Sequence, residues 1–211
     1  MERDRQPHVD LAPPNAPVVR IVNLMPRETV QFIYEAACAR APMFRASGVV
    51  ASAGTAGVQS RIAPEHRTSL VLLDFPEVFP WFLALVRRLL PLACRLLVLP
   101  PFYPVDTEIQ LTAHGEGGFF KQHSDNGTYR LHRRAVSYVY YFGHPSYTFT
   151  GGELVFYGPS PWVYHLGQSI IAPKWNSIVF FPSGMSHEVW PVSAPGDFRL
   201  GRFTLNGWMS R

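Results

Sequence analysis

Two residues that stand two positions apart, His123 and Asp125, offer the clearest chemistry in this sequence. They lie at and just beyond the end of an expected strand over residues 119–123. Alternate side chains of a strand share one face, so an imidazole nitrogen and a carboxylate oxygen can reach the same ion. A third ligand must come from a distant segment. We nominate His187, which follows the apolar run 178–181 and a turn.

Two histidines and one carboxylate leave coordination positions open for other molecules, an arrangement that suits iron(II). A closed zinc site would use four ligands, usually with thiolates, and neither Cys38 nor Cys94 is near in the sequence. The spacing alone does not decide the question, because further histidines are available as ligands: His114, His132, His144 and His165. A cupin-like enzyme with another metal would favour an HxH pair, and the sequence contains none.

The segments around these candidate ligands favour strands. From residue 105 onward, short apolar runs alternate with glycine, proline, asparagine and serine. We expect strands over residues 107–113, 119–123, 135–142, 153–157, 168–172, 177–181, 187–192 and 199–208. A series of about eight short strands is typical of a sandwich or barrel.

The first half of the sequence favours helices. One helix is expected from residue 27 to about residue 41, with Pro26 at its start. A second is expected over residues 76–90, where apolar residues recur at helical spacing, and Pro91 should kink or restart it. Residues 46–62 are small and rich in glycine, which fits short strands with turns or a mobile loop.

We expect a single folded domain. Residues 1–17 are polar and contain several prolines, so they should form a loose tail before a domain at residues 18–211. Within this domain, residues 18–104 are expected to be a helical support region that packs on a β core at residues 105–208. The predicted class is therefore α+β, mainly β.

Several motifs in the second half occur in a recognisable order. They are Gly117-Gly118-Phe119-Phe120-Lys121-Gln122-His123-Ser124-Asp125, Val139-Tyr140-Tyr141-Phe142, Phe149-Thr150-Gly151-Gly152-Glu153-Leu154, Phe180-Phe181-Pro182 leading to His187-Glu188-Val189, and Arg202-Phe203-Thr204 before Trp208. Together they resemble the 2-oxoglutarate and iron(II)-dependent oxygenase superfamily, especially its prolyl-4-hydroxylase-like branch. The resemblance covers about residues 105–208, and the residues before them carry no comparable motif.

The resemblance implies a fold, a set of cofactors and a reaction. The implied fold is a double-stranded β-helix, or jelly roll, with the N-terminal helices packed on one sheet. The implied metal is Fe(II), held by His123, Asp125 and His187, with 2-oxoglutarate and O2 as cosubstrates. The implied reaction is hydroxylation of an unactivated C–H bond, in which 2-oxoglutarate is converted to succinate and CO2.

The resemblance also implies that Arg202 contacts the cosubstrate. A guanidinium group offers a planar pair of donors that fits a carboxylate. Thr204 shares the strand face and can add a hydroxyl donor, and Tyr141 is a third candidate, with core packing as its alternative. Arg199 is the competing arginine, but it stands nearer the Pro195-Gly196 turn and has no hydroxyl two residues on.

Two further positions carry structural expectations. Gly151 and Gly152 are expected to form a turn that needs positive φ angles. His114 lies near the position at which the branch often holds a tyrosine, so it either substitutes as a cosubstrate contact or marks a different pocket. Its role is left open.

The segment after Asp125 is basic and predicts a substrate preference. Arg130, Arg133 and Arg134 are expected to flank the pocket mouth and to favour an acidic or carboxylate-bearing substrate, with a solvated loop as the alternative. The sequence does not identify that substrate. Small molecules, amino acids and short peptides are all candidates.

Composition narrows the partners and the location. The net charge of +4 comes almost entirely from scattered arginines, a pattern that does not favour nucleic-acid binding. The most apolar stretch, residues 81–99, contains three arginines and a proline, so we expect no membrane span. The charged N-terminus lacks the apolar core of a signal peptide, and two isolated cysteines favour a reducing cytoplasm. The oligomeric state stays open.

One rival function deserves a direct comparison. A catalytically inactive jelly-roll protein would bind a metal or a carboxylate as a sensor or scaffold. A protein that has lost its catalytic activity tends to lose some of the ligands and cosubstrate contacts. This alternative is therefore disfavoured by the complete set of His123, Asp125, His187 and Arg202.

Overall fold

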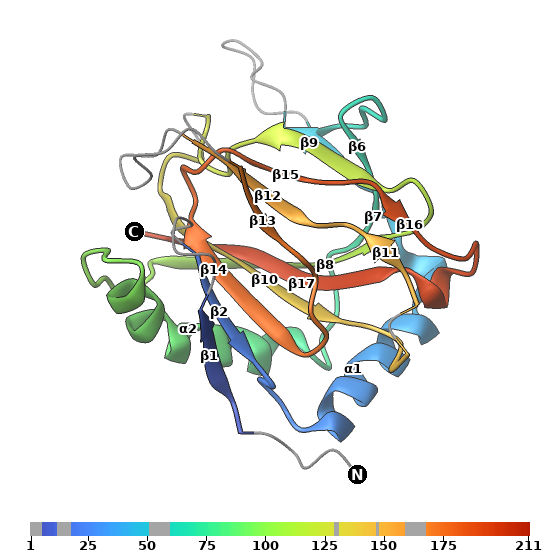
Figure 1. Cartoon of the computed structure of the whole chain (residues 1–211), viewed down its shortest axis with the longest axis horizontal. Helices are drawn as coiled ribbons and strands as arrows, with labels where there is room; N and C mark the ends of the chain where they lie inside the picture. Colours follow the sequence, from blue (N-terminus) through green and yellow to red (C-terminus); the bar gives the residue numbers. More distant parts are fainter. Residues whose placement is uncertain (1–5, 12–17, 51–59, 129–130, 147, 159–167) are drawn as a thin grey trace.

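Two antiparallel sheets face each other in this computed structural model (Figure 1). The structure describes residues 6–11, 18–50, 60–128, 131–146, 148–158 and 168–211. The large sheet has the strand order β1-β2-β14-β10-β17-β8-β7-β3 and the small sheet the order β13-β12-β15-β9-β6. The expected fold, a mainly β jelly roll with helices on one sheet, is confirmed.

The strands of the large sheet come from both halves of the chain. Their bounds are His8–Leu11 (β1), Val19–Val22 (β2), Ser177–Pro182 (β14), Arg134–Phe142 (β10), Arg202–Ser210 (β17), Asp106–His114 (β8), Leu70–Leu72 (β7) and Arg45–Ala46 (β3). Strand β17 lies between β10 and β8, so its side chains stand at the centre of the sheet.

The small sheet carries the segments expected to hold the metal. Its strands are Gln168–Ile171 (β13), Leu154–Tyr157 (β12), His187–Val189 (β15), Phe119–His123 (β9) and Arg67–Thr68 (β6). Two short pairs complete the described strands: Thr150–Gly151 (β11) with Val192–Ser193 (β16), and Val49–Val50 (β4) with Ser60–Arg61 (β5).

Alternation along the strands separates two cores. In β14, Ile178 and Phe180 pack with the helices, whereas Val179 and Phe181 face the small sheet. Both faces of the large sheet are therefore apolar over its central strands. This explains why its segments read as continuous apolar runs instead of alternating ones.

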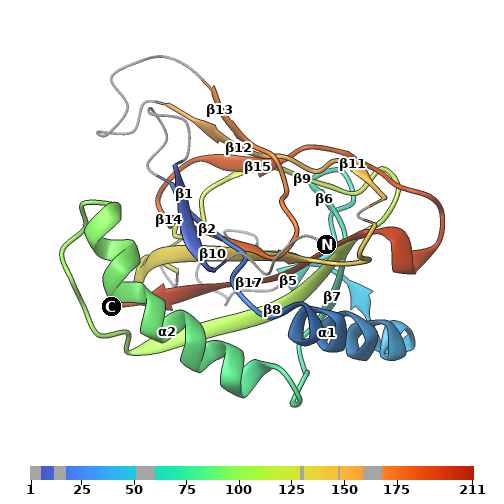
Figure 2. The ribbon, with the colours of Figure 1, turned by 60° about the horizontal axis from the view of Figure 1, so that its bottom comes forward.

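Both helices cover the outer face of the large sheet, opposite the small sheet (Figure 2). They are α1 (Arg27–Ala39) and α2 (Phe79–Leu96), and two 3-10 turns follow the same side, η1 (Ala41–Met43) and η2 (Phe198–Leu200). Phe82 of α2 is fully buried and its ring lies 5.4 Å from that of Tyr140. None of the helices in the described part of the chain has the length and apolarity needed to cross a bilayer.

Of the two outcomes expected at Pro91, a kink or a restart of α2, the restart is wrong. The helix continues through Pro91 to Leu96. Pro91 is exposed, whereas Leu90, Ala93 and Cys94 bury one face of the helix on both sides of it. Packing of that face against the sheet therefore outweighs the hydrogen bond that a proline removes.

The expected loose tail and helical support region also contain strands. Residues 8–11 form β1, which pairs with β2 along its whole length, and Asp10 makes an ion pair of 2.8 Å with Arg20. Four strands that precede residue 105 are members of the main sheets: β2, β3 and β7 belong to the large sheet and β6 to the small one. The remaining tail residues, 1–5 and 12–17, lie outside the described part. One core cluster contains residues from Val19 to Met209, and the division into a single domain stays a prediction.

Candidate metal centre and cosubstrate pocket

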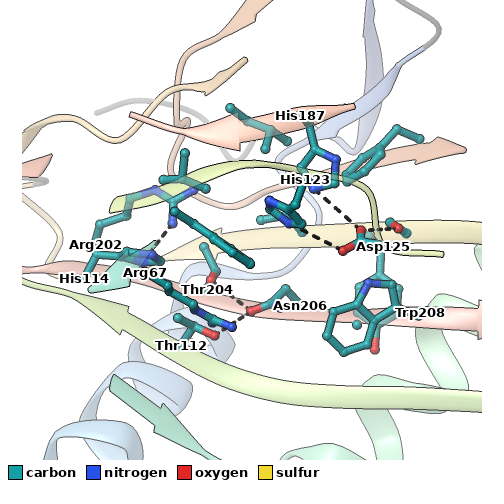
Figure 3. Close-up of a pocket in the computed structure, with 18 residues that line it drawn as sticks. Arg67, Thr112, His114, His123, Asp125, His187, Arg202, Thr204, Asn206 and Trp208 are labelled. Carbon is teal, nitrogen blue, oxygen red and sulfur yellow. Dashed lines mark hydrogen bonds and ion pairs between the residues drawn. The ribbon is translucent and has the colours of Figure 1, made fainter. Parts of the chain in front are cut away.

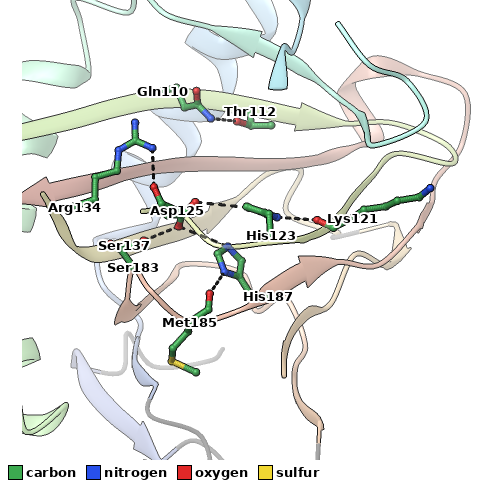
Figure 4. Close-up of polar contacts among 10 residues, drawn as sticks. All are labelled: Gln110, Thr112, Lys121, His123, Asp125, Arg134, Ser137, Ser183, Met185 and His187. Carbon is green, nitrogen blue, oxygen red and sulfur yellow. Dashed lines mark hydrogen bonds and ion pairs between the residues drawn. The ribbon is translucent and has the colours of Figure 1, made fainter. Parts of the chain in front are cut away.

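The three predicted ligands meet at the edge where β9 and β15 pair (Figure 4). His123 is the last residue of β9 and lies opposite His187, the first residue of β15, in the strand register. Asp125 follows β9 by two residues. One ligand atom from each residue lies within 4.8 Å of the other two, so all three can hold one metal ion.

Backbone carbonyls orient both imidazoles. Nδ1 of His123 lies 2.8 Å from the Lys121 oxygen, and Nδ1 of His187 lies 2.8 Å from the Met185 oxygen. A carbonyl only accepts, so each Nδ1 carries the proton and each Nε2 presents its lone pair toward Asp125. Metal-binding histidines usually donate their other ring N–H to a carbonyl or carboxylate in this way, which fixes the tautomer and the ring orientation.

Asp125 is held as a carboxylate. Burial alone would raise its pKa, but His187, His123 and a 2.6 Å hydrogen bond from Ser137 Oγ outweigh burial and keep the pKa well below its usual range. Burial lowers the pKa of His187 to about 4. At neutral pH His187 is therefore a neutral imidazole and Asp125 a charged carboxylate, the protonation states that a metal requires.

A cavity between the two sheets extends from the ligands toward Arg202 (Figure 3). Arg202 begins β17, only 2% of its surface is exposed, and the strand register places it opposite His114 of β8. Thr204 is two residues further along the same face. No carboxylate among the described residues forms an ion pair with Arg202.

Polar groups around Arg202 lack partners. Nε of Arg202, Nε2 of His114 and the hydroxyl of Tyr141 are buried and make no hydrogen bond of ordinary geometry with a described residue. The Arg202 guanidinium lies 5.0 Å from the Tyr141 ring centre. Buried donors without acceptors are costly, so an anionic ligand at this end of the cavity would satisfy them. The site thus fits one carboxylate of a dicarboxylate cosubstrate.

His114 acts in this cluster as a neutral imidazole. Burial, followed by the charges of Arg202 and Arg67, holds its pKa well below the ordinary value. Its Nδ1 lies 3.3 Å from the Arg202 NH1 group and must accept from it. The proton then resides on Nε2, which leaves a second N–H donor free beside the guanidinium.

Comparison with known proteins identifies the family. A model of the 2OG-Fe(II) oxygenase superfamily matches residues 109–210, which include the three candidate ligands and Arg202. The chain belongs to this superfamily. The family implies Fe(II), 2-oxoglutarate and O2, the cofactors that the sequence motifs predicted.

Individual relatives agree with this placement. The chain is 37% identical over 158 residues to an uncharacterised PKHD-type hydroxylase of Synechocystis, a match that covers 71% of this chain and 52% of the relative. The chain thus spans about half the length of that relative.

Solved structures share the fold. A prolyl-4-hydroxylase of Pseudomonas putida superposes with a TM-score of 0.66 at 22% identity, over 93% of both chains. A prolyl hydroxylase of Trichoplax adhaerens, in complex with a peptide fragment of hypoxia-inducible factor, gives 0.62 at 15% identity and covers 93% of this chain and 84% of its own.

In this chain, a pair of glycines makes room for the side chain of Arg202. Gly151 and Gly152 have φ angles of 73° and 69°, which confirms the positive φ angles expected at this pair. A Cβ added at Gly152 would lie 2.6 Å from the Arg202 Cδ and 2.9 Å from Val192. Only glycine therefore combines this backbone conformation with the observed position of Arg202.

The other predicted cosubstrate contacts lie in the same region. Thr204 lines the cavity, and its hydroxyl is 3.3 Å from Asn206 Oδ1, which also accepts a 2.8 Å hydrogen bond from Thr112. Tyr141 is fully buried and pairs with Thr204 in the register of β10 and β17. Arg199, the competing arginine, lies on η2 with an exposed side chain, outside the lining of this cavity.

The predicted substrate arginines are placed differently. Arg134 is buried, forms an ion pair with Glu108 and lies 3.7 Å from the Trp208 ring centre, so its charge is already balanced. The side chain of Arg133 donates to the Arg211 oxygen. Neither lines the cavity beside the ligands. Arg130 lies outside the described residues.

Sequence reasoning missed two residues of the site. Ser137 could have been found, because it stands on the same face of β10 as Tyr141. Arg67 could not, because it belongs to a two-residue strand with no motif, and only the fold brings it to the cavity.

Proposed function

We propose that this protein is an Fe(II)- and 2-oxoglutarate-dependent hydroxylase. His123, Asp125 and His187 would hold the metal, with their donor atoms already gathered at one edge of the small sheet. When bound, the iron centre supplies oxidative decarboxylation of 2-oxoglutarate coupled to oxidation of a C–H bond. The protein contributes ligand geometry, orientation and a pocket between the two sheets.

Arg202 is the proposed anchor for the far carboxylate of 2-oxoglutarate. The group of unpartnered donors around it, from Arg202, His114 and Tyr141, is the single observation that carries the proposal. A plain metal-binding scaffold has no need for such a group beside the ion. We assign Thr204 to the same subsite, because it follows Arg202 on one strand face and lines the cavity.

His114 would serve this subsite in two ways. Its Nδ1 accepts from Arg202 and fixes one edge of the guanidinium, and its buried Nε2–H adds a neutral donor that has no partner among the described residues. Ser137 would position the metal ligand Asp125 through its 2.6 Å hydrogen bond.

For the prime substrate we propose a broad class. We place it among small molecules, amino acids and short peptides, and the Trichoplax relative in complex with a peptide is compatible with the last class. We also propose a reducing compartment such as the cytoplasm, since Cys38 and Cys94 are both free and buried.

Succinate formation tests the proposal. In air, with Fe(II) added, the purified protein should convert 2-oxoglutarate to succinate at a slow uncoupled rate that rises when the substrate is present. His187→Ala should lower this rate by about 100-fold or more, because it removes a metal ligand. Arg133→Gln should leave the uncoupled rate unchanged. A folded wild-type protein that forms no succinate would favour the sensor or scaffold alternative.

A further inference from the structure

Arg67 lines the cavity from a strand of the small sheet, whereas Arg202 belongs to the large sheet, and both lie at the end of the cavity that His114 occupies (Figure 3). Arg67 lies on β6 and faces Phe120 of β9 in the strand register. Its guanidinium lies 4.7 Å from the Phe120 ring centre, and that ring stacks on the imidazole of His123 at 3.6 Å. Arg67 is therefore one aromatic ring away from the metal centre.

Local contacts hold Arg67 in place and leave one end of it available. Its Nε donates a 2.8 Å hydrogen bond to Ser69 Oγ, and Ser69 in turn lies 2.9 Å from Ser47 Oγ. Its backbone N–H donates to the Ala63 oxygen at 2.9 Å. The two terminal nitrogens of its guanidinium make no hydrogen bond with a described residue. The outer edge of the guanidinium can therefore donate to a ligand.

The charge on Arg67 has no partner in the described part of the chain. Burial lowers the pKa of Arg67 to about 10, and the Asp125 carboxylate opposes this shift, so Arg67 is charged at neutral pH. Arg134 shows the ordinary solution for a buried arginine here, because it is paired with Glu108. Arg67 has no comparable acid, and Asp125 is the one acidic residue in the described lining of the cavity.

The site loaded with Fe(II) and 2-oxoglutarate would carry one unbalanced positive charge. Fe(II) and Arg202 bring three positive charges, and Asp125 with the 2-oxoglutarate dianion brings three negative ones. The charge of Arg67 is left over. Arg67 is only partly exposed. A charge that is largely withdrawn from water and has no partner is costly, and binding of a monoanion beside it lowers that cost.

We propose that Arg67 binds a carboxylate of the prime substrate, so that the substrate is a small acid, amino acid or short peptide whose carboxylate lies close to the oxidised carbon. This inference rests on the proposed function of the site and narrows its substrate class. A guanidinium edge with two parallel donors matches the planar oxygens of a carboxylate. One uncompensated charge also matches a monoanion better than a phosphate dianion.

The test compares carboxylic acids with their amides. Acetate with acetamide, and N-acetyl amino acids with their primary amides, are added to the Fe(II)- and 2-oxoglutarate-loaded enzyme, and the stimulation of succinate formation is measured. Wild-type enzyme should prefer acids within the panel. Arg67→Gln should reduce that preference by about 30-fold or more, Arg67→Lys should restore part of it, and exposed Arg88→Gln should match wild type.

Binding of 2-oxoglutarate separates this proposal from the function on which it rests. Arg67→Gln should leave the anaerobic Fe(II)–2-oxoglutarate absorption band and its half-saturating 2-oxoglutarate concentration within about twofold of wild type. If that concentration rises as much as is expected for Arg202→Gln, Arg67 is a cosubstrate ligand and the proposal is overturned. An unchanged acid preference in Arg67→Gln, no acid preference in wild type, or a response to phosphate monoesters alone would also overturn it. Absence of the band in wild type would instead defeat the proposed function, and this proposal with it.

Discussion

At the scale of single residues, the site depends on groups that do not touch the ligands themselves. Arg202 is positioned on one side by its hydrogen bond to His114. On the other side its side chain occupies the space that a Cβ at Gly152 would fill. Asp125 is aimed by Ser137. Such supporting contacts determine whether donors lie within a fraction of an ångström of their productive position, and catalysis is sensitive to displacements of that size.

Gly152→Ala should weaken 2-oxoglutarate binding. The new Cβ would overlap with Arg202 Cδ and force the guanidinium away from its present position, so we expect the 2-oxoglutarate dissociation constant to rise about tenfold or more. Equilibrium binding to the anaerobic Fe(II) protein measures this constant.

Gly117→Ala is the matched control. Gly117 has a φ of 68°, close to that of Gly152, but no atom lies within 4 Å of a Cβ added there. Its substitution should carry the same backbone strain and leave 2-oxoglutarate affinity near the wild-type value. Equal losses of affinity in both variants would show that backbone strain, and not contact with Arg202, is responsible.

At the scale of elements, strand β10 joins the support layer to the site. Tyr138 and Tyr140 face the helices, whereas Ser137 and Tyr141 face the site and the second core. Helix α2 therefore stabilises the strand that positions Asp125 without contacting the metal centre. Stability and metal binding can be tested separately on the two faces.

Phe82→Ala should destabilise the protein without changing the site. Phe82 is fully buried, and its ring packs on Tyr138 and Tyr140. We expect the free energy of unfolding to fall by about 3–5 kcal/mol, measured by urea denaturation of the metal-free protein. Phe32→Ala, at a position that is 49% exposed on α1, should change it by less than about 0.5 kcal/mol. A loss of similar size in both variants would contradict this packing.

Element predictions from the sequence succeed where periodicity and motif agree. The expected strand over residues 119–123 is β9, and the ligand pair follows from its end as foreseen. Strand β1 and strand β6 escape prediction, since four and two residues carry too little pattern and only pairing with a neighbour makes them strands. Arg67 was missed for that reason. The charge of Arg134 is balanced by Glu108, which lies 26 positions away in the sequence, so the sequence alone does not reveal the pair.

At the scale of the whole molecule, buried histidines link the site to stability. His187 has a pKa lowered to about 4 by burial, and His114 has a pKa held well below the ordinary value by burial and by neighbouring arginines. Both are neutral in the folded protein. In the unfolded chain they take up protons near pH 6.5, so the unfolded state binds more protons below that pH.

The metal-free protein should therefore lose stability in mild acid. As the pH falls from about 6.5 toward 4, each of these histidines should lower the free energy of unfolding by up to ~1.4 kcal/mol per pH unit. Asp125, whose folded pKa is depressed, adds its own loss only at lower pH. Urea denaturation at a series of pH values measures the slope.

His114→Asn should flatten this pH dependence, whereas substitution of exposed His66 by glutamine should not. Stability that stays constant between pH 7 and pH 5 in the metal-free wild type would show that the two histidines are not buried in the neutral form.

The most direct measurement is an anaerobic titration of the protein with Fe(II) and 2-oxoglutarate, followed through the visible charge-transfer band of the chelate. The band should form in wild type and disappear in His123→Ala. Arg202→Gln should retain it but need about 30-fold more 2-oxoglutarate, while Arg199→Gln, which changes the exposed competing arginine, should match wild type. A well-folded wild-type protein that gives no band would contradict the assignment of this cavity as an iron and 2-oxoglutarate site.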